Sequence, residues 1–153
     1  MKPLRVLFTE LTKYFYDIDD NVDLNLDISI SLYNQGCFLN DHIDGKSPVK
    51  NYASMLIYLN KDWKSEFGGQ LKLEDARTGE KTVLDVPFNR LVIQQTRGWT
   101  LHGYDQTNFP PGIYRTSIAT YAYTKHILHI EKPRTTDWKA SDDSSWLKKW
   151  MAK

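Results

Sequence analysis

The sequence predicts a mainly β, single-domain protein, and three observations lead to this prediction. Residues 24–32 alternate strictly between apolar and polar side chains, which is the period of a strand with one buried face. Further β-type segments follow at short intervals between turn residues, a spacing typical of sandwiches and barrels. In residues 115–123 a polar, bulky face carries Arg115, Ser117 and Tyr121. Such a face on an interior strand favours a barrel that encloses a ligand cavity, and we therefore expect a jelly roll.

The expected elements run from a helix through several strands to a second helix. Apolar residues at steps of three and four predict a helix over residues 4–15, with an apolar face formed by Leu4, Leu7, Phe8, Leu11, Tyr14 and Phe15. Strands are predicted at residues 24–32, 52–59, 70–73, 83–86, 90–94 and 115–123. A short C-terminal helix is predicted by the helical spacing of Trp146, Leu147, Trp150 and Met151. We expect this helix to pack on the barrel, with a dimer contact or a lid over the active site as alternatives.

Composition limits the class of protein. The chain has 153 residues, enough for one sizeable core, so we expect one domain over residues 1–153 with its core in about 24–123. Its 20 basic and 19 acidic residues leave a net charge of +1, which gives no electrostatic reason to expect nucleic acid or an acidic membrane as partner. A single cysteine, Cys37, cannot form an internal disulfide, and no apolar run is long enough to span a bilayer. A cytoplasmic protein without a membrane segment is therefore expected.

Three residues suggest a metal site. His42 and Asp44 form a His-x-Asp triplet, and residues two apart on an extended segment project to the same side. His102 follows sixty residues later. Taken alone, each has a simpler explanation, as a surface pair or as a buried, hydrogen-bonded histidine. Together, two imidazoles and one carboxylate match the facial triad of non-haem Fe(II) oxygenases, which leaves coordination positions open.

A basic residue on the next predicted strand suggests an anion site. Arg115 lies thirteen residues after His102, and Ser117 shares its strand face. A dicarboxylate that chelates a metal at one end needs a cation for its far carboxylate, and the planar fork of arginine binds carboxylates bidentately. By contrast, we expect His126 and His129 to lie on a solvated edge rather than in a second metal site.

With these residues in this order, the chain resembles the prolyl 4-hydroxylase-type Fe(II)/2-oxoglutarate dioxygenases, in which a double-stranded β-helix, or jelly roll, holds the active site. The likeness covers about residues 24–123. Its Tyr-Leu-Asn-Lys-Asp-Trp stretch at 58–63, with the Gly-Gly at 68–69, looks especially like the oxygen-sensing prolyl hydroxylases. The other matching segments are 33–36, 42–44, 86–91, 99–103 and 115–121.

The resemblance implies a role for each matching residue. His42, Asp44 and His102 would be the iron ligands. The cosubstrate 2-oxoglutarate would be bound through its far carboxylate by Arg115 and Tyr58. The remaining residues expected around the pocket are Tyr33, Ser117 and Tyr121.

The implied activity is hydroxylation of an unactivated C–H bond with Fe(II), 2-oxoglutarate and dioxygen, and ascorbate is a further candidate cofactor. Because Asp44 occupies a coordination position, hydroxylation is favoured over halogenation. We expect a prolyl residue in a peptide or protein as the substrate, in a groove walled by Ser47–Val49 and Asn108–Pro110. A free amino acid, a sugar or another small metabolite is the alternative substrate. A third hypothesis is a non-catalytic jelly-roll binding module. The complete triad and Arg115 argue against it.

Overall fold

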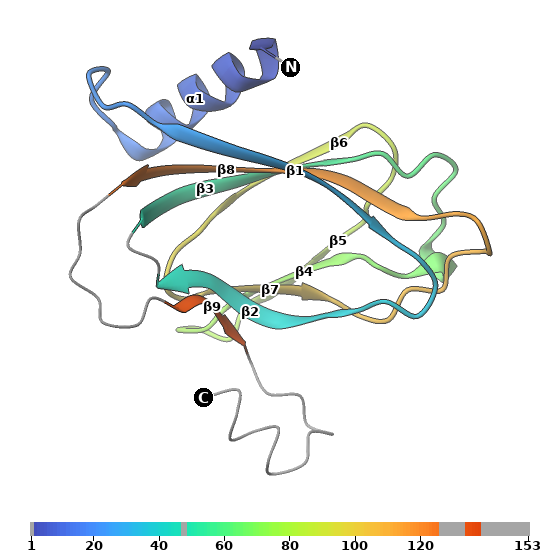
Figure 1. Cartoon of the computed structure of the whole chain (residues 1–153). Coiled ribbons are helices and arrows are strands. Elements are labelled where there is room, and N and C mark those ends of the chain that lie inside the picture. Colours follow the sequence, from blue (N-terminus) through green and yellow to red (C-terminus); the bar gives the residue numbers. More distant parts are fainter. Residues whose placement is uncertain (1, 47–48, 126–133, 139–153) are drawn as a thin grey trace.

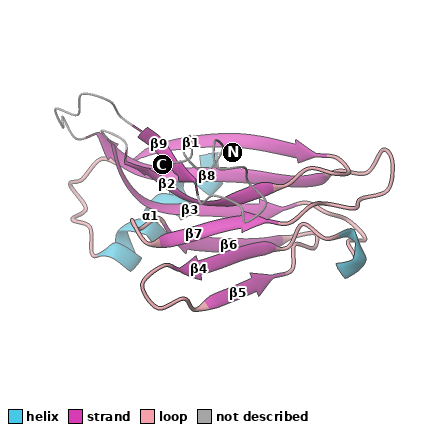
Figure 2. Cartoon of the chain, turned by 90° about the horizontal axis from the view of Figure 1, so that it is seen from below, coloured by secondary structure: helices cyan, strands magenta, loops and turns pink. Residues whose placement is uncertain are grey.

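The chain folds into two antiparallel β-sheets that face each other, with one long helix on the outside (Figure 1). The computed structural model describes residues 2–46, 49–125 and 134–138. The four-stranded sheet has the order β1 (Asn25–Tyr33), β8 (Arg115–Lys125), β3 (Val49–Tyr58) and β6 (Arg90–Gln95). The five-stranded sheet has the order β5 (Lys81–Leu84), β4 (Leu71–Asp75), β7 (Thr100–Tyr104), β2 (Leu39–Lys46) and β9 (Arg134–Trp138). The strand axes of the two sheets are roughly aligned with each other (Figure 2). The predicted jelly roll is confirmed.

Helix α1 (Lys2–Tyr16) packs on the outer face of the four-stranded sheet. Its contact line passes through Phe8 and Thr12, and Phe8 is buried against Ala53, Met55 and Ala122. The predicted helix is therefore present, but its predicted contact face is partly wrong, since Tyr14 is 81% exposed. A helix lying on a sheet touches it along one narrow strip, so the rest of its apolar face stays in solvent. The predicted C-terminal helix lies outside the described residues. Within the described ranges, none of the helices has both the length and the apolar character needed to cross a bilayer.

Strand alternation separates two packed regions. On β3, Ala53 and Met55 point toward α1, while Leu56 and Tyr58 point into the space between the sheets. Tyr58 packs there in a cluster with Leu71, Val86, Leu73, Leu84 and Val92. The alternation of residues 52–59 predicts that Met55 and Tyr58 lie on opposite faces of the strand, and the structure confirms this. We call the faces that point between the sheets the inner faces, and the site described below lies on them.

The register of the strands gives the fold two distinct ends. At one end β1 finishes where β8 begins, with Tyr33 opposite Arg115, and Tyr58 at the end of β3 pairs with Ser117. We call this the Arg115 end. At the other end, Asn25 pairs with Tyr123 and Val49 with Lys125. Within this sheet, neighbouring strands are antiparallel, so the loop that follows one strand and the loop that follows its neighbour lie at opposite ends.

Strand β2 contains a β-bulge where it pairs with β7. Leu39 lies opposite Tyr104 and His42 opposite His102, so three steps along β2 match two steps along β7. Bulges of this kind re-aim neighbouring side chains and are common beside active sites. The bulge falls directly before His42.

Candidate active site

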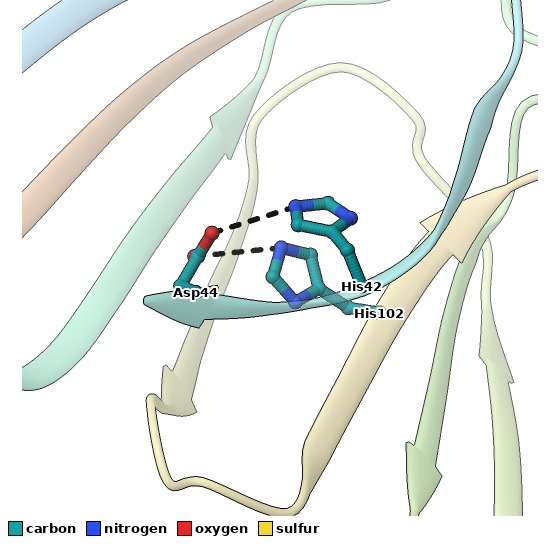
Figure 3. A group of neighbouring side chains, drawn as sticks. All are labelled: His42, Asp44 and His102. Atoms are coloured by element: carbon teal, nitrogen blue, oxygen red, sulfur yellow. Dashed lines mark ion pairs between the residues drawn. The ribbon is translucent and has the colours of Figure 1, made fainter. Parts of the chain in front are cut away.

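The three predicted metal ligands converge between the sheets (Figure 3). His42 and Asp44 project from β2, and His102 projects from the opposing position on β7. The Nε2 atom of His42 lies 3.4 Å from Oδ1 of Asp44, and Nε2 of His102 lies 3.5 Å from Oδ2. One candidate ligand atom from each of the three residues lies within 4.8 Å of the other two. Within the part of the chain that the structure describes, this is the one cluster of three or more such residues.

The pKa values of the two imidazoles are shifted in opposite directions, because burial is outweighed by polar partners at His42 but dominates at His102. Nδ1 of His42 lies 2.9 Å from the carbonyl oxygen of Asn40, so a proton on Nδ1 leaves Nε2 with a lone pair facing the site. Burial alone would lower the pKa of His42, but the Asp44 carboxylate and the Asn40 carbonyl outweigh it and raise the pKa. His102 is also buried, and this desolvation lowers its pKa to about 4. His102 is therefore neutral at physiological pH, as a metal ligand must be.

Asp44 completes a donor set that fits a divalent cation. Burial would raise the pKa of Asp44, but its interactions with His42 and His102 outweigh this and lower the pKa, so the group is a carboxylate. Its Oδ2 atom is buried and accepts no hydrogen bond from the described residues. A buried carboxylate oxygen without a donor is costly, and a bound cation would remove this cost. Two imidazole nitrogens and one carboxylate oxygen are the ligands that non-haem Fe(II) uses.

The bulge that positions His42 depends on a glycine in β7. A Cβ atom on Gly103 would lie 2.6 Å from both Oδ1 of Asp41 and the carbonyl oxygen of Leu39. The Asp41 carboxylate is in turn 3.6 Å from Nζ of Lys72, which also contacts Asp105 at 2.6 Å. Gly103 thus allows the bulge to press against β7 beside His102.

Arg115 is a buried cation at the Arg115 end of the same inner space. Its side chain is on β8, and the residue is 3% exposed. Its Nε–H group donates to the carbonyl oxygen of Gly69 at 2.7 Å, and an Nη2–H group donates to the Tyr58 hydroxyl at 3.5 Å. No carboxylate of the described residues lies within ion-pair distance of it. A buried charge without a counter-ion is strongly unfavourable, and a bound anion would remove this cost.

Gly69 makes room for this guanidinium. Its φ angle is +71°, a conformation that favours glycine. A Cβ atom at this position would lie 2.9 Å from Cδ of Arg115. The Gly68-Gly69 pair therefore also supplies a hydrogen-bond acceptor to Arg115.

The other predicted pocket residues lie on the same inner faces. Ser117 is buried two residues after Arg115 on β8, and Tyr33 lies opposite Arg115 on β1. Tyr121 lies further along β8 toward the triad. Burial raises its pKa to about 12, and the nearby Asp44 charge adds to the effect. Their roles in binding stay predictions.

The structure adds Tyr104, which the sequence reasoning missed. This residue is buried at the end of β7, two residues after His102. Its ring centroid lies 4.1 Å from Cζ of Arg115 and 5.5 Å from the ring of Tyr33. The available signal was its spacing from His102, because residues two apart on a strand share a face.

The predicted groove walls do not flank one groove. Residues 108–110 precede β8 at the Arg115 end, whereas Val49 begins β3 at the opposite end. Phe109 is 1% exposed and packs on Phe67 with ring centroids 5.5 Å apart, so it is a core residue of its loop. Ser47, Pro48, His126 and His129 lie outside the described residues.

Strand β1 is an edge strand of its sheet, and the described residues place no further strand beside it. Asp27 and Ser29 of β1 are exposed, in register with Tyr121 and Ala119 of β8. The hydroxyl of Tyr123 donates to Oδ1 of Asp27 at 3.2 Å. A molecule that reaches the triad from this side would pass a polar rim.

Comparison with solved structures finds prolyl hydroxylases among the similar folds. A prolyl hydroxylase from Trichoplax adhaerens, solved in complex with a hypoxia inducible factor peptide fragment, aligns with a TM-score of 0.60 at 18% identity, covering 78% of this chain and 56% of that one. A Phytophthora capsici prolyl 4-hydroxylase aligns with a TM-score of 0.57 at 25% identity, covering 78% and 41%. A Pseudomonas putida prolyl-4-hydroxylase aligns with a TM-score of 0.56 at 22% identity, covering 64% and 50%. The chain thus spans about half the length of these proteins.

Comparison of the sequence with curated proteins finds no match. Comparison with family models does find one, the 2OG-Fe(II) oxygenase superfamily, over residues 28–123. The matched range contains the three converging ligands, Arg115 and Tyr58. The chain belongs to the 2OG-Fe(II) oxygenase superfamily.

Proposed function

We propose that the protein is a 2-oxoglutarate-dependent dioxygenase that hydroxylates an unactivated C–H bond, with a prolyl residue of a peptide or protein as its substrate. The observation that carries the proposal is that the inner faces of the two sheets carry both the His42, Asp44 and His102 donor set and a buried Arg115 for which the described residues supply no counter-ion. The first can hold Fe(II), and the second needs an anion. A 2-oxoglutarate molecule satisfies both, because it can chelate the metal with one end and present a carboxylate at the other.

The three ligands would hold Fe(II) on one side and leave the other side of the ion to small molecules. When bound, Fe(II) supplies the activation of dioxygen that is coupled to oxidative decarboxylation of 2-oxoglutarate. The protein contributes binding, orientation and exclusion of water. Burial of His42 and His102 restricts water on the ligand side of the site.

Arg115 and Tyr58 are suited to bind the far carboxylate of 2-oxoglutarate. A guanidinium has five N–H donors, and Arg115 uses one for Gly69 and one for Tyr58, so donors are left for a carboxylate. Burial raises the pKa of Tyr58 although the Arg115 charge opposes this, so Tyr58 keeps its proton. Its hydroxyl can therefore accept from Arg115 and donate to the carboxylate at the same time.

Two features support a peptide as the substrate. The Trichoplax neighbour was solved with a peptide fragment bound. In this chain, the nine-residue edge strand β1 carries the exposed polar residues Asp27 and Ser29, and an edge strand has backbone groups that can pair with an extended peptide. We expect the reaction to take place in the cytoplasm, since the single cysteine, Cys37, suits a reducing compartment.

The test is succinate release from 2-oxoglutarate, with Fe(II) and ascorbate, across proline-containing peptides, free amino acids and sugars. We expect a peptide to stimulate release and to gain one oxygen on proline by mass spectrometry. Arg115→Met should abolish stimulation, whereas Arg77→Met, which changes an exposed arginine, should not. Stimulation by a sugar or a free amino acid, with every peptide unmodified, would replace the peptide by a small metabolite. Wild-type protein that binds Fe(II) but not 2-oxoglutarate would refute the enzymatic proposal.

A further inference from the structure

We propose that Tyr104 is a positioning residue for the cosubstrate, acting through Arg115: the face of its ring fixes the plane of the guanidinium so that the free N–H groups meet the far carboxylate. The inference rests on the proposed function and adds to it a residue outside the metal triad and the carboxylate clamp.

The contact is between a buried ring and a buried cation. Tyr104 and Arg115 are each 3% exposed, and Cζ of Arg115 lies 4.1 Å from the ring centroid of Tyr104. The ring of Tyr58 is further away, at 5.1 Å. A cation over an aromatic face is attracted to it, and the attraction grows when both groups are removed from water.

The other contacts of Arg115 do not fix its plane. The bond from Nε to Gly69 at 2.7 Å anchors one atom of the guanidinium, and the Tyr58 contact at 3.5 Å is long for a hydrogen bond. The group can still rotate about the anchored bond unless a flat surface limits its tilt. Tyr104 provides such a surface. Bidentate binding of a carboxylate requires the fork and the carboxylate to lie close to one plane.

Tyr104 also links this clamp to the metal site. It is two residues from His102 on β7, and both side chains lie on the inner face. A cosubstrate held at both ends requires the two anchors to keep a set separation. Strand β7 thus positions the metal ligand His102 and, through Tyr104, the guanidinium plane of Arg115.

The experiment compares phenylalanine and fluorinated phenylalanines at position 104, because these variants keep the shape of the ring. Binding of 2-oxoglutarate to the Mn(II)-loaded protein is measured by calorimetry without turnover, and Mn(II) binding is measured separately. We expect Tyr104→Phe to bind 2-oxoglutarate about as tightly as the wild type. Successive fluorination should weaken binding stepwise, and Tyr104→Leu should weaken it roughly 10- to 30-fold, the scale of a desolvated cation–π contact. Mn(II) affinity should stay unchanged in all variants.

The alternatives give different patterns. A fluorine series with constant 2-oxoglutarate affinity would overturn the proposal, even if Tyr104→Leu fails to fold. A Tyr104→Phe variant as impaired as Tyr104→Leu would assign the effect to the hydroxyl and would also overturn it. Failure of the proposed function looks different, because the wild type itself would then not bind 2-oxoglutarate and Arg115→Met would change nothing.

Discussion

Replacing Gly103 with alanine should lower both stability and metal affinity, because the new side chain would displace the bulge of β2 that precedes His42. The new Cβ atom would lie 2.6 Å from the Leu39 carbonyl oxygen and from Oδ1 of Asp41, and 3.0 Å from the Asp41 backbone nitrogen. Carbon and oxygen normally approach to about 3.3–3.6 Å, so the bulge must move away by roughly 0.7–1.0 Å. Two of these three atoms belong to the backbone that leads into His42. Overpacking of this kind costs about 1–3 kcal/mol of stability.

The second consequence is on metal affinity. Moving the bulge shifts His42 relative to His102, and disturbing the groups that orient metal ligands typically lowers affinity about 10- to 100-fold. Metal titration followed by calorimetry measures this, and thermal unfolding of the metal-free protein measures the stability loss. Gly98→Ala is the matched control, since nothing lies within 4 Å of a Cβ atom there. Adding Asp41→Ala should rescue Gly103→Ala only in part, because the Leu39 oxygen remains. Wild-type metal affinity and stability in Gly103→Ala would refute this reasoning.

Three further predictions concern the core, the cosubstrate and acid. Phe8→Ala should lower the free energy of unfolding by about 3–5 kcal/mol, measured by urea denaturation, because Phe8 is completely buried under α1. Tyr58→Phe should weaken 2-oxoglutarate binding by about 1.5–3 kcal/mol, the value of a hydrogen bond to a charged group, when titrated by calorimetry. The metal-free protein should lose stability as the pH falls from 6.5, because the unfolded chain then protonates His102 while the folded chain, with a pKa of about 4, does not. The loss by pH 4 amounts to about 3 kcal/mol from His102, partly offset by the raised pKa of His42.

Matched variants separate these effects from general damage. Phe15→Ala changes an exposed aromatic residue of the same helix and should be nearly neutral. Tyr58→Phe should leave metal affinity intact, since Tyr58 contacts Arg115 rather than the triad. His102→Gln should flatten the acid dependence of stability, and an unchanged slope in that variant would contradict the assignment to His102.

The sequence predicts the helix and the strands whose apolar residues recur at a regular spacing. The alternation of residues 24–32 placed a strand one residue away from β1, and the alternation of β3 assigned Met55 and Tyr58 to opposite faces. Helix α1 was also predicted, because its apolar steps are local. Its contact line through Thr12 was not, since a threonine has no apolar signal and the sheet beneath decides which side is covered.

The missed features depend on pairing between distant residues. Strand β2 has few apolar residues, and its bulge exists only relative to β7. The contact of Tyr104 with Arg115 requires β7 and β8, which belong to different sheets, to face each other. The groove walls were misplaced for the same reason, because spacing along the chain does not say at which end of a strand a loop emerges.

The distance along the strands between the Arg115 end and the middle of β1 bears on how a protein with the proposed activity could acquire new substrates. The groups proposed to bind the shared cosubstrate lie near the Arg115 end, while the exposed positions Asp27 and Ser29 lie on a separate edge strand. Substitutions at Asp27 and Ser29 touch neither the histidines nor Arg115. Directed evolution could therefore vary the β1 edge in a library of variants while the proposed 2-oxoglutarate site stays unchanged.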